Sequence, residues 1–259
     1  YIFRHGLDPK YVAYFFQSSS FQEQKKQLVT ESKLARISGS NLAKIKLPIP
    51  PLEVQREIVS ILDKMEKLQA ELQAELQARS QQYEFYRDQL LTSCEATGAR
   101  QVPMREVAEV RSGWGFPNVE QGNASGDMPF YKVSDMNTVG NETEMRRANH
   151  YISSDVARRL GVNPAPAGTI VFPKIGAAVA TNKKRLLSLE SAYDNNVMGL
   201  VPGPLIRPRF LFHWMQRFNL SFLANDSGAV PSIRKSEAES VLVPVPALSE
   251  QDRIVAILD

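Results

Sequence analysis

The sequence predicts an α+β protein in which a globular domain with a curved β-sheet is joined to long helices that form an antiparallel coiled coil. Three observations support this fold class. One 16-residue segment occurs twice, at residues 48–63 and 244–259. Residues 52–97 contain neither proline nor glycine and are dominated by helix formers. Residues 99–242 contain several short apolar segments separated by turn residues, as is typical of β-strands.

The repeated segment predicts the start of a helix in both copies. Its shared pattern is Pro-x-Pro-(Pro/Ala)-Leu-x-x-Gln-x-x-Ile-Val-x-Ile-Leu-Asp. Pro-x-Pro cannot lie inside a helix and enforces an extended approach. Pro51 suits the first helical turn, where a missing N–H costs nothing. The acidic residues Glu53, Glu57 and Glu250 place negative charge at the positive end of the helix.

The similarity between the two copies extends upstream of the prolines. Residues 9–17 and 208–216 both begin with proline and continue with bulky apolar residues typical of an amphipathic helix. Each copy therefore predicts an apolar helix, a basic polar loop, a short strand, Pro-x-Pro and a second helix. Because the chain starts within this pattern and without methionine, we expect a fragment that holds one whole unit and the end of an earlier one.

The first copy contains a basic segment with several hydroxyl side chains, at residues 25–38. Two interpretations of this segment stay open. It is either a solvated loop before a helix or a clamp on a nucleic-acid backbone. The second interpretation rests on the fact that Lys, Arg and Ser side chains, together with helix N-terminal amides, bind phosphates.

Residues 52–97 predict one long helix that ends at Gly98. At 1.5 Å per residue this helix would span roughly 60 Å. Apolar residues recur along it at alternating spacings of three and four, as in a coiled-coil seam: Ile58, Ile61, Leu62, Met65, Leu68, Leu72, Leu76, Tyr83, Tyr86 and Leu90. Such a helix cannot bury its stripe on itself. We therefore expect a second helix beside it, either the one that starts at Leu248 or one from another copy.

Residues 99–242 predict one complete globular domain. Residues 183–185 (Lys-Lys-Arg) predict a loop, and residues 205–219 predict an apolar helix. The predicted strands are short and apolar or alternating: residues 129–136, 167–176 and 192–200. Several short strands with few helices favour a curved sheet.

The composition limits the class of protein. The 259 residues are 43% apolar, as in ordinary globular proteins, and the single Cys94 excludes a disulfide framework. No apolar run approaches the ~20 residues of a membrane span, so we expect a cytoplasmic protein without membrane contact. The net charge is +5 over residues 1–51, −4 over residues 52–98 and +4 over residues 99–242. The basic parts suit a polyanion, and the acidic helix suits a protein partner.

The sequence contains no convincing catalytic or metal-binding pattern. Residues 163–166 (Asn-Pro-Ala-Pro) lack the aromatic side chain with which adenine methyltransferases stack a flipped base. Residues 113–116 (Gly-Trp-Gly-Phe) are too short for a dinucleotide fingerprint, and one cysteine gives no zinc pattern. A nuclease cluster would need four acidic residues to converge near Lys132, which spacing alone cannot establish: Asp127, Asp135, Glu142 and Glu144. We therefore expect a non-catalytic chain that binds no metal.

These motifs together resemble the specificity subunit of a Type I restriction–modification system. The resemblance rests on the duplicated Pro-x-Pro pattern, on the long helix rich in Leu, Glu and Gln, and on three landmarks of the globular domain. The landmarks are residues 129–135 (Pro-Phe-Tyr-Lys-Val-Ser-Asp), 168–172 (Gly-Thr-Ile-Val-Phe) and 228–233 (Gly-Ala-Val-Pro-Ser-Ile). The resemblance covers essentially the whole chain, but most of a first domain and most of a distal helix are missing.

The resemblance implies two target-recognition domains separated by two long conserved helices that pair antiparallel. Residues 1–46 would be the C-terminal remnant of the first recognition domain, and residues 47–98 the central conserved region with its spacer helix. Residues 99–242 would be the second recognition domain, and residues 243–259 the start of the distal conserved helix. Each domain would read one half of a split target in double-stranded DNA, and the helices would fix the spacing of the halves.

The implied partners are modification (methyltransferase) subunits docked on the helices, restriction subunits, and another copy of the chain through self-association of the helices. Adenine methylation with S-adenosylmethionine would belong to the modification subunit, and cleavage with ATP and Mg²⁺ to the restriction subunit. This chain is then expected to hold no cofactor. Two competing hypotheses are a coiled-coil protein–protein scaffold without DNA readout and a stand-alone nuclease or methyltransferase.

The candidate DNA-binding residues are basic, hydroxyl and amide side chains, because Arg and Lys bind guanine or phosphate and Asn binds adenine. For each of them, a solvated surface position is the alternative. In the globular domain they are Arg111, Ser112, Lys132, Lys174, Asn182, Lys183, Lys184, Arg185, Asn195, Asn196, Ser232, Arg234 and Lys235. In the remnant they are Lys33 and Arg36.

Overall fold

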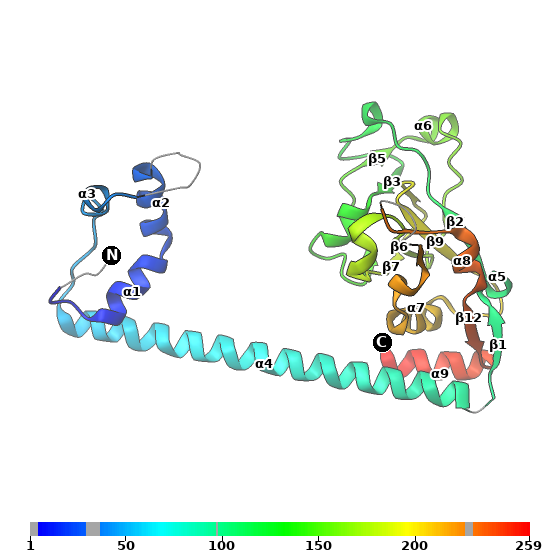
Figure 1. Cartoon of the computed structure of the whole chain (residues 1–259), viewed down its shortest axis with the longest axis horizontal. Coiled ribbons are helices and arrows are strands. Elements are labelled where there is room, and N and C mark those ends of the chain that lie inside the picture. The colour runs from blue at the N-terminus through cyan, green and yellow to red at the C-terminus, as the bar shows by residue number, and fades with distance from the viewer. Residues whose placement is uncertain (1–4, 30–36, 97, 226–229) are drawn as a thin grey trace. The chain divides into compact units, whose positions relative to one another are not determined.

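A computed structural model of the chain divides into two compact units, residues 1–81 (unit 1) and residues 82–259 (unit 2). Figure 1 labels many of the helices and strands of both units, numbered in chain order. The structure describes residues 5–29, 37–96, 98–225 and 230–259. The long helix α4 (Leu52–Ala96) contributes its first part to unit 1 and its last part to unit 2.

Unit 1 is helical over its described residues. Its elements are α1 (Pro9–Gln17), α2 (Ser19–Leu28), α3 (Gly39–Leu42) and the first part of α4. The Ser18 hydroxyl accepts a hydrogen bond from the backbone N–H of Phe21 and so starts a second helix directly after the first. Residues 25–28, predicted as part of a basic loop, are therefore helical, and this part of the prediction was wrong.

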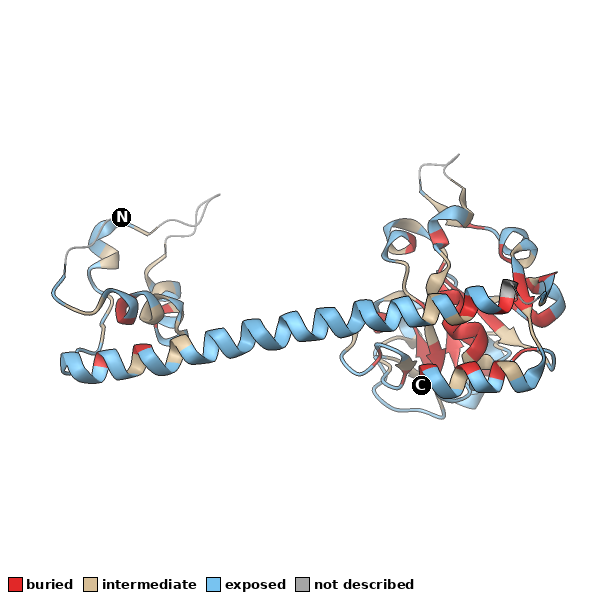
Figure 2. Ribbon diagram, turned by 90° about the horizontal axis from the view of Figure 1, so that it is seen from below, coloured by how far each residue is buried: buried red, intermediate tan, exposed pale blue. Residues whose placement is uncertain are grey.

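Helix α4 is 45 residues long, which confirms the predicted uninterrupted helix. Its end is marked by Gly98, whose positive φ of 85° is the left-handed conformation that glycine favours after a helix. Apolar side chains in the middle of the helix are between 61% and 69% exposed: Met65, Leu68, Leu72 and Leu76. Figure 2 shows this exposed stretch in pale blue. The predicted stripe is thus present, and it is open to a partner over these residues.

Unit 2 contains a five-stranded sheet of order β2-β9-β6-β7-β4, in which all neighbours are antiparallel except β4 and β7. Its strands are β2 (Ala108–Ser112), β9 (Val197–Pro202), β6 (Ile170–Pro173), β7 (Arg185–Leu187) and β4 (Glu144–Met145). A three-stranded sheet contains β5 (Tyr151–Ile152), β3 (Met128–Tyr131) and β8 (Ala192–Tyr193). Two further pairs join β1 (Arg100–Pro103) to β12 (Leu242–Val245) and β10 (Ala224–Asn225) to β11 (Ser232–Ile233).

The predicted strand at residues 129–136 is shorter than expected and ends at Tyr131. The carboxylate of Asp135 accepts a hydrogen bond from the backbone N–H of Lys132 at 2.6 Å. This local bond competes with strand pairing and turns the chain into the 3-10 helix η2 (Val133–Asn137).

The helices of unit 2 pack around its two larger sheets. They are α5 (Met104–Val107), α6 (Ser154–Arg159), α7 (Pro208–Arg217), α8 (Lys235–Ser240) and α9 (Leu248–Leu258), with 3-10 helices η1 (Asn118–Glu120), η3 (Gly176–Thr181) and η4 (Leu220–Leu223). One core joins Leu91 of α4, Phe172 of β6, Phe210 of α7 and Ile254 of α9, all fully buried. Burial of each such side chain stabilises the fold by about 1.5–3 kcal/mol.

Helix α9 lies along the last part of α4 and runs in the opposite direction (Figures 1 and 2). At the start of α9, the Cys94 thiol donates to Glu250 at 3.9 Å. At the end of α9, the ring of His213 connects Tyr83 of α4 to Asp259. The expected antiparallel helix pair is therefore present over the length of α9.

The glutamine of the repeated segment is buried in both units, and its side-chain amide joins two segments of the chain by hydrogen bonds. In unit 2, the Gln251 side chain accepts from the backbone N–H of Arg207 at 2.7 Å and donates to the carbonyls of Leu205 and Pro246 at 3.0 and 2.9 Å. In unit 1, the Gln55 side chain accepts from the N–H of Asp8 at 2.9 Å and donates to the carbonyl of Pro50 at 2.8 Å. One amide thus ties each Pro-x-Pro turn to the residue before the apolar helix.

The last aspartate of the repeated segment binds the same apolar helix in both units. Asp63 contacts the Lys10 ammonium at 2.6 Å and the Tyr14 hydroxyl at 2.7 Å. The hydrogen bond from Lys10, followed by that from Tyr14, lowers the pKa of Asp63.

The aspartate of the second copy makes the corresponding contacts in unit 2. Asp259 contacts Arg209 at 2.5 Å and His213 Nε2 at 2.8 Å. Burial lowers the pKa of His213. A neutral ring fits its contacts, because Nε2–H can donate to Asp259 while Nδ1 accepts from the Tyr83 hydroxyl at 3.0 Å. The two helices of each repeat are therefore held together by equivalent polar contacts.

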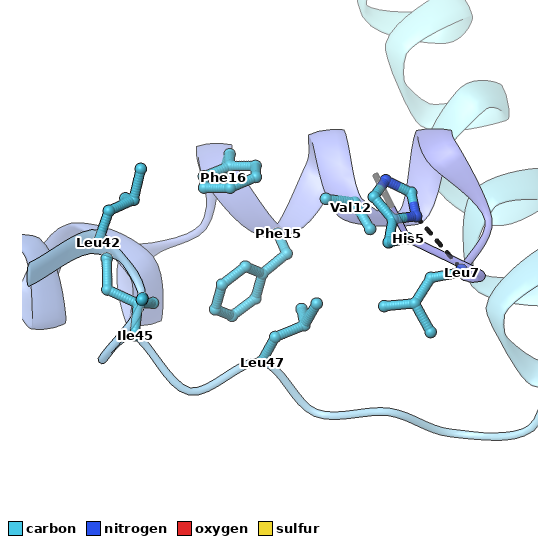
Figure 3. A pocket seen from close by; sticks show the side chains of 9 residues that line it. His5, Leu7, Val12, Phe15, Phe16, Leu42, Ile45 and Leu47 are labelled. Carbon is cyan, nitrogen blue, oxygen red and sulfur yellow. Dashed lines mark hydrogen bonds between the residues drawn. The ribbon is translucent and has the colours of Figure 1, made fainter. Parts of the chain in front are cut away.

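Unit 1 also contains an open apolar cavity of about 230 Å³. Figure 3 shows side chains from α1, from α3 and from the segment before α4 pointing into it. Three of its lining residues are Phe16, Leu42 and Ile45, whose counterparts in the second copy are Met215, Ala238 and Val241. In unit 2 these counterparts join Met104, Phe172 and Leu200 around a much smaller cavity of about 10 Å³. In unit 2, side chains of the five-stranded sheet and Met104 cover the apolar face that these counterparts form. The corresponding face of unit 1 is open.

We predict that Gln251→Ala lowers the free energy of unfolding by about 1–3 kcal/mol, because it leaves a buried N–H and two carbonyls without a partner. Chemical denaturation of the whole chain measures this change. Gln73→Ala, on an exposed face of α4, is the matched control and should change stability by less than about 0.5 kcal/mol. Equal effects of the two substitutions would contradict the assigned role of Gln251.

Candidate nucleic-acid interface

Three neighbouring strands, β2, β9 and β6, bring polar segments together at one end of the five-stranded sheet. Ser112 at the end of β2 is paired with Met198, and Pro173 at the end of β6 is paired with Val197 at the start of β9. The segments that follow β2 and β6 and the segment that precedes β9 therefore lie side by side. Polar side chains on these segments are brought together although the segments lie far apart in sequence, near residues 112, 174 and 196.

Backbone hydrogen bonds hold the segments at this end of the sheet together. The N–H of Lys174 donates to the carbonyl of Asn196 at 2.9 Å, and the carbonyl of Lys174 accepts from the N–H of Ile233 at 2.8 Å. The segment after β2 passes very close to the turn before β9. A Cβ on Gly113 would lie 2.0 Å from the carbonyl oxygen of Asp194, so only glycine fits there.

Lys132, which follows β3 of the three-stranded sheet, lies at the same end of the five-stranded sheet. Strands β3 and β8 are parallel, and the N–H of Asp194 donates to the carbonyl of Tyr131 at 2.9 Å. Lys132 and Asp194, which follow these strands, are thus neighbours. The Asp194 carboxylate is buried and accepts from the N–H and the side-chain amide of Asn196 at 3.1 and 3.2 Å. Burial raises the pKa of Asp194, against the hydrogen bonds from Asn196 and the charge of Lys132.

We call this group of candidate side chains the strand-end cluster. Its members are Arg111, Ser112, Lys132, Lys174, Asn195, Asn196 and Ser232. Lys174 Nζ donates to the Ser112 hydroxyl at 3.2 Å, and Lys132 Nζ donates to the Gln121 side chain at 2.9 Å. Among the described residues, neither ammonium forms an ion pair with a carboxylate within 4 Å, whereas Arg111 is paired with Glu109 at 2.7 Å. The two lysines leave positive charge for an anionic ligand.

The expectation for Lys184 as a DNA ligand was wrong. Its side chain is fully buried, and its ammonium donates to the Asn182 side chain at 2.7 Å and to the Phe218 carbonyl at 2.5 Å. Burial, assisted by the nearby charge of Arg87, lowers the pKa of Lys184 to about 7. A buried ammonium cannot reach a phosphate, so Lys184 supports the fold.

The neighbours of Lys184 are also largely structural. Asn182 has a positive φ of 54°, and its side chain also accepts from the N–H of Leu220 at 2.9 Å. Arg185 lies in β7, not in the predicted loop, and donates to the carbonyls of Lys184 and Met136. Lys183 is half-buried, and its ammonium contacts the Asn137 side chain. The basic tripeptide therefore does not form one exposed cluster.

The remaining candidates either follow the cluster residue Ser232 in sequence or lie outside the described residues. Arg234 and Lys235 are exposed at the start of α8, where Lys235 contacts Glu239 at 3.5 Å. Lys33 and Arg36 lie outside the described residues.

Sequence reasoning missed the residues that hold the cluster in place. Gln121 positions the Lys132 ammonium, and Gly113, dismissed as part of a failed dinucleotide motif, allows the close approach to Asp194. One signal was available: Asp194-Asn195-Asn196 is a typical turn sequence, because an Asp side chain accepts from the backbone two residues on.

The four acidic residues considered for a nuclease cluster are engaged at separate places. Asp127 accepts from Ser154, and Glu142 accepts from the N–H of Gly140. Asp135 binds Lys132 and Asn149, whereas Glu144 binds arginines. Over the described part of the chain, no group of three or more His, Cys, Asp or Glu side chains is placed to hold a metal ion. Within the same residues, no helix has both the length and the apolar character needed to cross a membrane.

Comparisons with known proteins agree with the repeat and the fold. The family model described as "Type I restriction modification DNA specificity domain" matches residues 2–79 and 99–259. The specificity subunit of a Type I restriction enzyme from Escherichia coli is 28% identical over 235 residues, which are 85% of this chain and 56% of that protein. The chain thus spans little more than half the length of this relative.

Two solved structures share the fold at low sequence identity. The Type I restriction–modification S subunit of M. genitalium matches with a TM-score of 0.59 and 18% identity, over 98% of this chain and 66% of its own. The HsdS subunit from Thermoanaerobacter tengcongensis matches with a TM-score of 0.50 and 18% identity, over 97% and 62%. These likenesses show that the mixed fold with a long helix occurs in both.

We predict that Lys184 makes stability depend on pH. Its folded pKa of about 7 lies below the unfolded value of 10.5, so between these values the unfolded chain binds a proton that the folded chain does not. Stability should therefore rise with pH through this window. From pH 7.5 to 9, the wild type should gain up to about 2 kcal/mol relative to Lys184→Met. Denaturant unfolding at both pH values measures this difference, and parallel pH profiles would refute the prediction.

Proposed function

Because the chain belongs to the Type I restriction modification DNA specificity domain family, we propose that it is the sequence-specific DNA-binding subunit of a Type I restriction–modification complex. Unit 2 reads one half of a bipartite target in double-stranded DNA. The chain itself has no catalytic step in this proposal. Methyl transfer and cleavage, with S-adenosylmethionine, ATP and Mg²⁺, belong to the modification and restriction subunits.

The observation that carries the proposal is the strand-end cluster. Protein–DNA interfaces combine cations that neutralise phosphates with donors and acceptors that read base edges. The cluster offers two lysines without carboxylate partners, Lys132 and Lys174, beside the exposed Asn195. Its residues lie at strand ends fixed by backbone hydrogen bonds, so a rigid scaffold positions them.

Helix α4 supplies the second half of the proposal. Residues 52–98 carry a net charge of −4, which disfavours contact with phosphates. The exposed stripe from Met65 to Leu76 offers the apolar spacing that a partner helix needs. We assign this stripe to a distal conserved helix, and the surface of the resulting pair to the modification subunits. The open cavity of unit 1 supports assigning residues 1–46 to the end of a first recognition domain.

A protein–protein scaffold without DNA readout is the alternative. The exposed stripe on α4 favours it, because a stripe of this kind suits helix pairing whether or not DNA is bound. The two functions differ in whether unit 2 has a nucleic-acid ligand.

The decisive experiment is methylome sequencing of cells that express the chain with its modification subunits. We expect a split motif with methylated adenine in one or both halves, present only when this chain is expressed. Methylation that does not depend on the chain, or that has no sequence motif, would reject the proposed function in favour of a scaffold.

We predict that Lys132→Ala weakens binding of the whole chain to duplex DNA similarly for all sequences. Loss of one phosphate contact should reduce the slope of log K against log salt by about 1. Titrations at several salt concentrations measure the slope. Lys67→Ala, which removes an exposed cation paired with Glu71 on α4, should leave the slope unchanged. An unchanged slope for Lys132→Ala would remove Lys132 from the interface.

A further inference from the structure

The backbone of Lys174 is held on both sides by distant segments of the chain. It directly follows β6, which lies at the centre of the five-stranded sheet. Its N–H is bonded to Asn196 on one side, and its carbonyl is bonded to Ile233 on the other. The next residue, Ile175, forms a bridge with Ser232. A lysine fixed on both sides has less freedom to lose on binding than a lysine in a loop.

The side chain of Lys174 is also positioned before any ligand arrives. Its ammonium donates to the Ser112 hydroxyl at 3.2 Å, and no carboxylate pairs with it within 4 Å among the described residues. The side chain is half-buried, and burial lowers its pKa. Part of the dehydration that an intermolecular contact requires has therefore already occurred in the folded chain.

Lys132 is also half-buried and held at its backbone and its ammonium, but its backbone bonds are local: its N–H donates to the Asp135 carboxylate, and its carbonyl accepts from the N–H of Asp135. It lies between the short strand β3 and the 3-10 helix η2, and its ammonium is held by Gln121, which immediately follows the 3-10 helix η1. A lysine at such a position suits a phosphate, which carries no sequence information. Base readout needs a donor held in a defined direction. Lys174 is fixed between two distant segments at the end of the central strand, whereas Lys132 is fixed by bonds within its own turn.

We propose that Lys174 is a specificity-determining residue of unit 2, which donates to the O6 and N7 acceptors of one guanine in the major groove while the Ser112 hydroxyl orients its ammonium. This inference rests on the proposed function and assigns base readout to Lys174 and phosphate contact to Lys132. Asn195 precedes the Asn196 that binds the N–H of Lys174; it is exposed, and its side chain forms no hydrogen bond within the described residues, so its amide is available for the neighbouring base pair.

A lysine and a glutamine at position 174 should prefer different bases at the base pair that they contact. An ammonium offers only donors and so suits guanine, whose major-groove edge presents two acceptors. A glutamine amide offers one donor and one acceptor and suits adenine. Lys174→Gln should therefore weaken binding to the wild-type site roughly ten- to one-hundred-fold and move the preference from guanine towards adenine at one position.

The test is selection of the whole chain, wild type or variant, against a pool of duplexes with randomised positions. We expect a motif for the wild type and the same motif with one changed base pair for Lys174→Gln. Ser112→Ala, which removes the hydrogen-bond acceptor of the Lys174 ammonium, should weaken the preference for guanine at that same position. Lys132→Gln should lower affinity uniformly and leave the motif intact, and Lys67→Gln should change neither.

The outcomes separate this inference from the proposed function. If the wild type enriches a motif and folded Lys174→Gln enriches the identical motif, the inference is overturned while the proposed function stands. Uniform weakening at all positions would make Lys174 a phosphate contact and would also overturn it. If Lys174→Gln does not fold, the Ser112→Ala selection decides the matter at the same base pair. A wild type that enriches no motif would reject the proposed function itself.

Discussion

The buried amide of Gln251, and its counterpart Gln55, is the interaction on which each junction of this chain depends. The prolines of Pro-x-Pro impose an extended approach, and the carbonyl of the second proline needs a hydrogen-bond partner when it is buried. The glutamine provides this partner and at the same time binds the N–H that precedes the apolar helix. One planar group therefore fixes the turn between the Pro-x-Pro segment, the apolar helix and the helix that follows the prolines.

The aspartate eight residues further along completes the junction with different chemistry in each copy. Asp63 uses a lysine and a tyrosine, and Asp259 uses an arginine and a histidine. The geometry is retained although the side chains differ, because both pairs offer one cation and one ring with a polar hydrogen. The two copies of the repeat therefore connect their two helices in the same way, although the residues that make the contacts differ.

The strand-end cluster follows from strand pairing and not from local sequence. Its segments meet because β2, β9 and β6 are neighbours in the sheet, and because Gly113 allows a close crossing over Asp194. The same packing removes Lys184 from solvent and uses Arg185 to bind carbonyls. Charge density along the sequence was therefore a poor guide here. The single Lys174, which follows an apolar strand, lies in the strand-end cluster, whereas the three consecutive cations at residues 183–185 do not form one exposed cluster.

The sequence by itself determined the long helix, the repeat and the helix starts, since these depend on interactions between residues close in the chain. The absence of proline and glycine sets the length of α4, and the three-four spacing sets its apolar stripe. Only the tertiary structure decided which polar residues form a surface. Strand order and the burial of Lys184 both depend on contacts between distant segments. Their energies are set by packing and desolvation, which a local pattern of residues does not record.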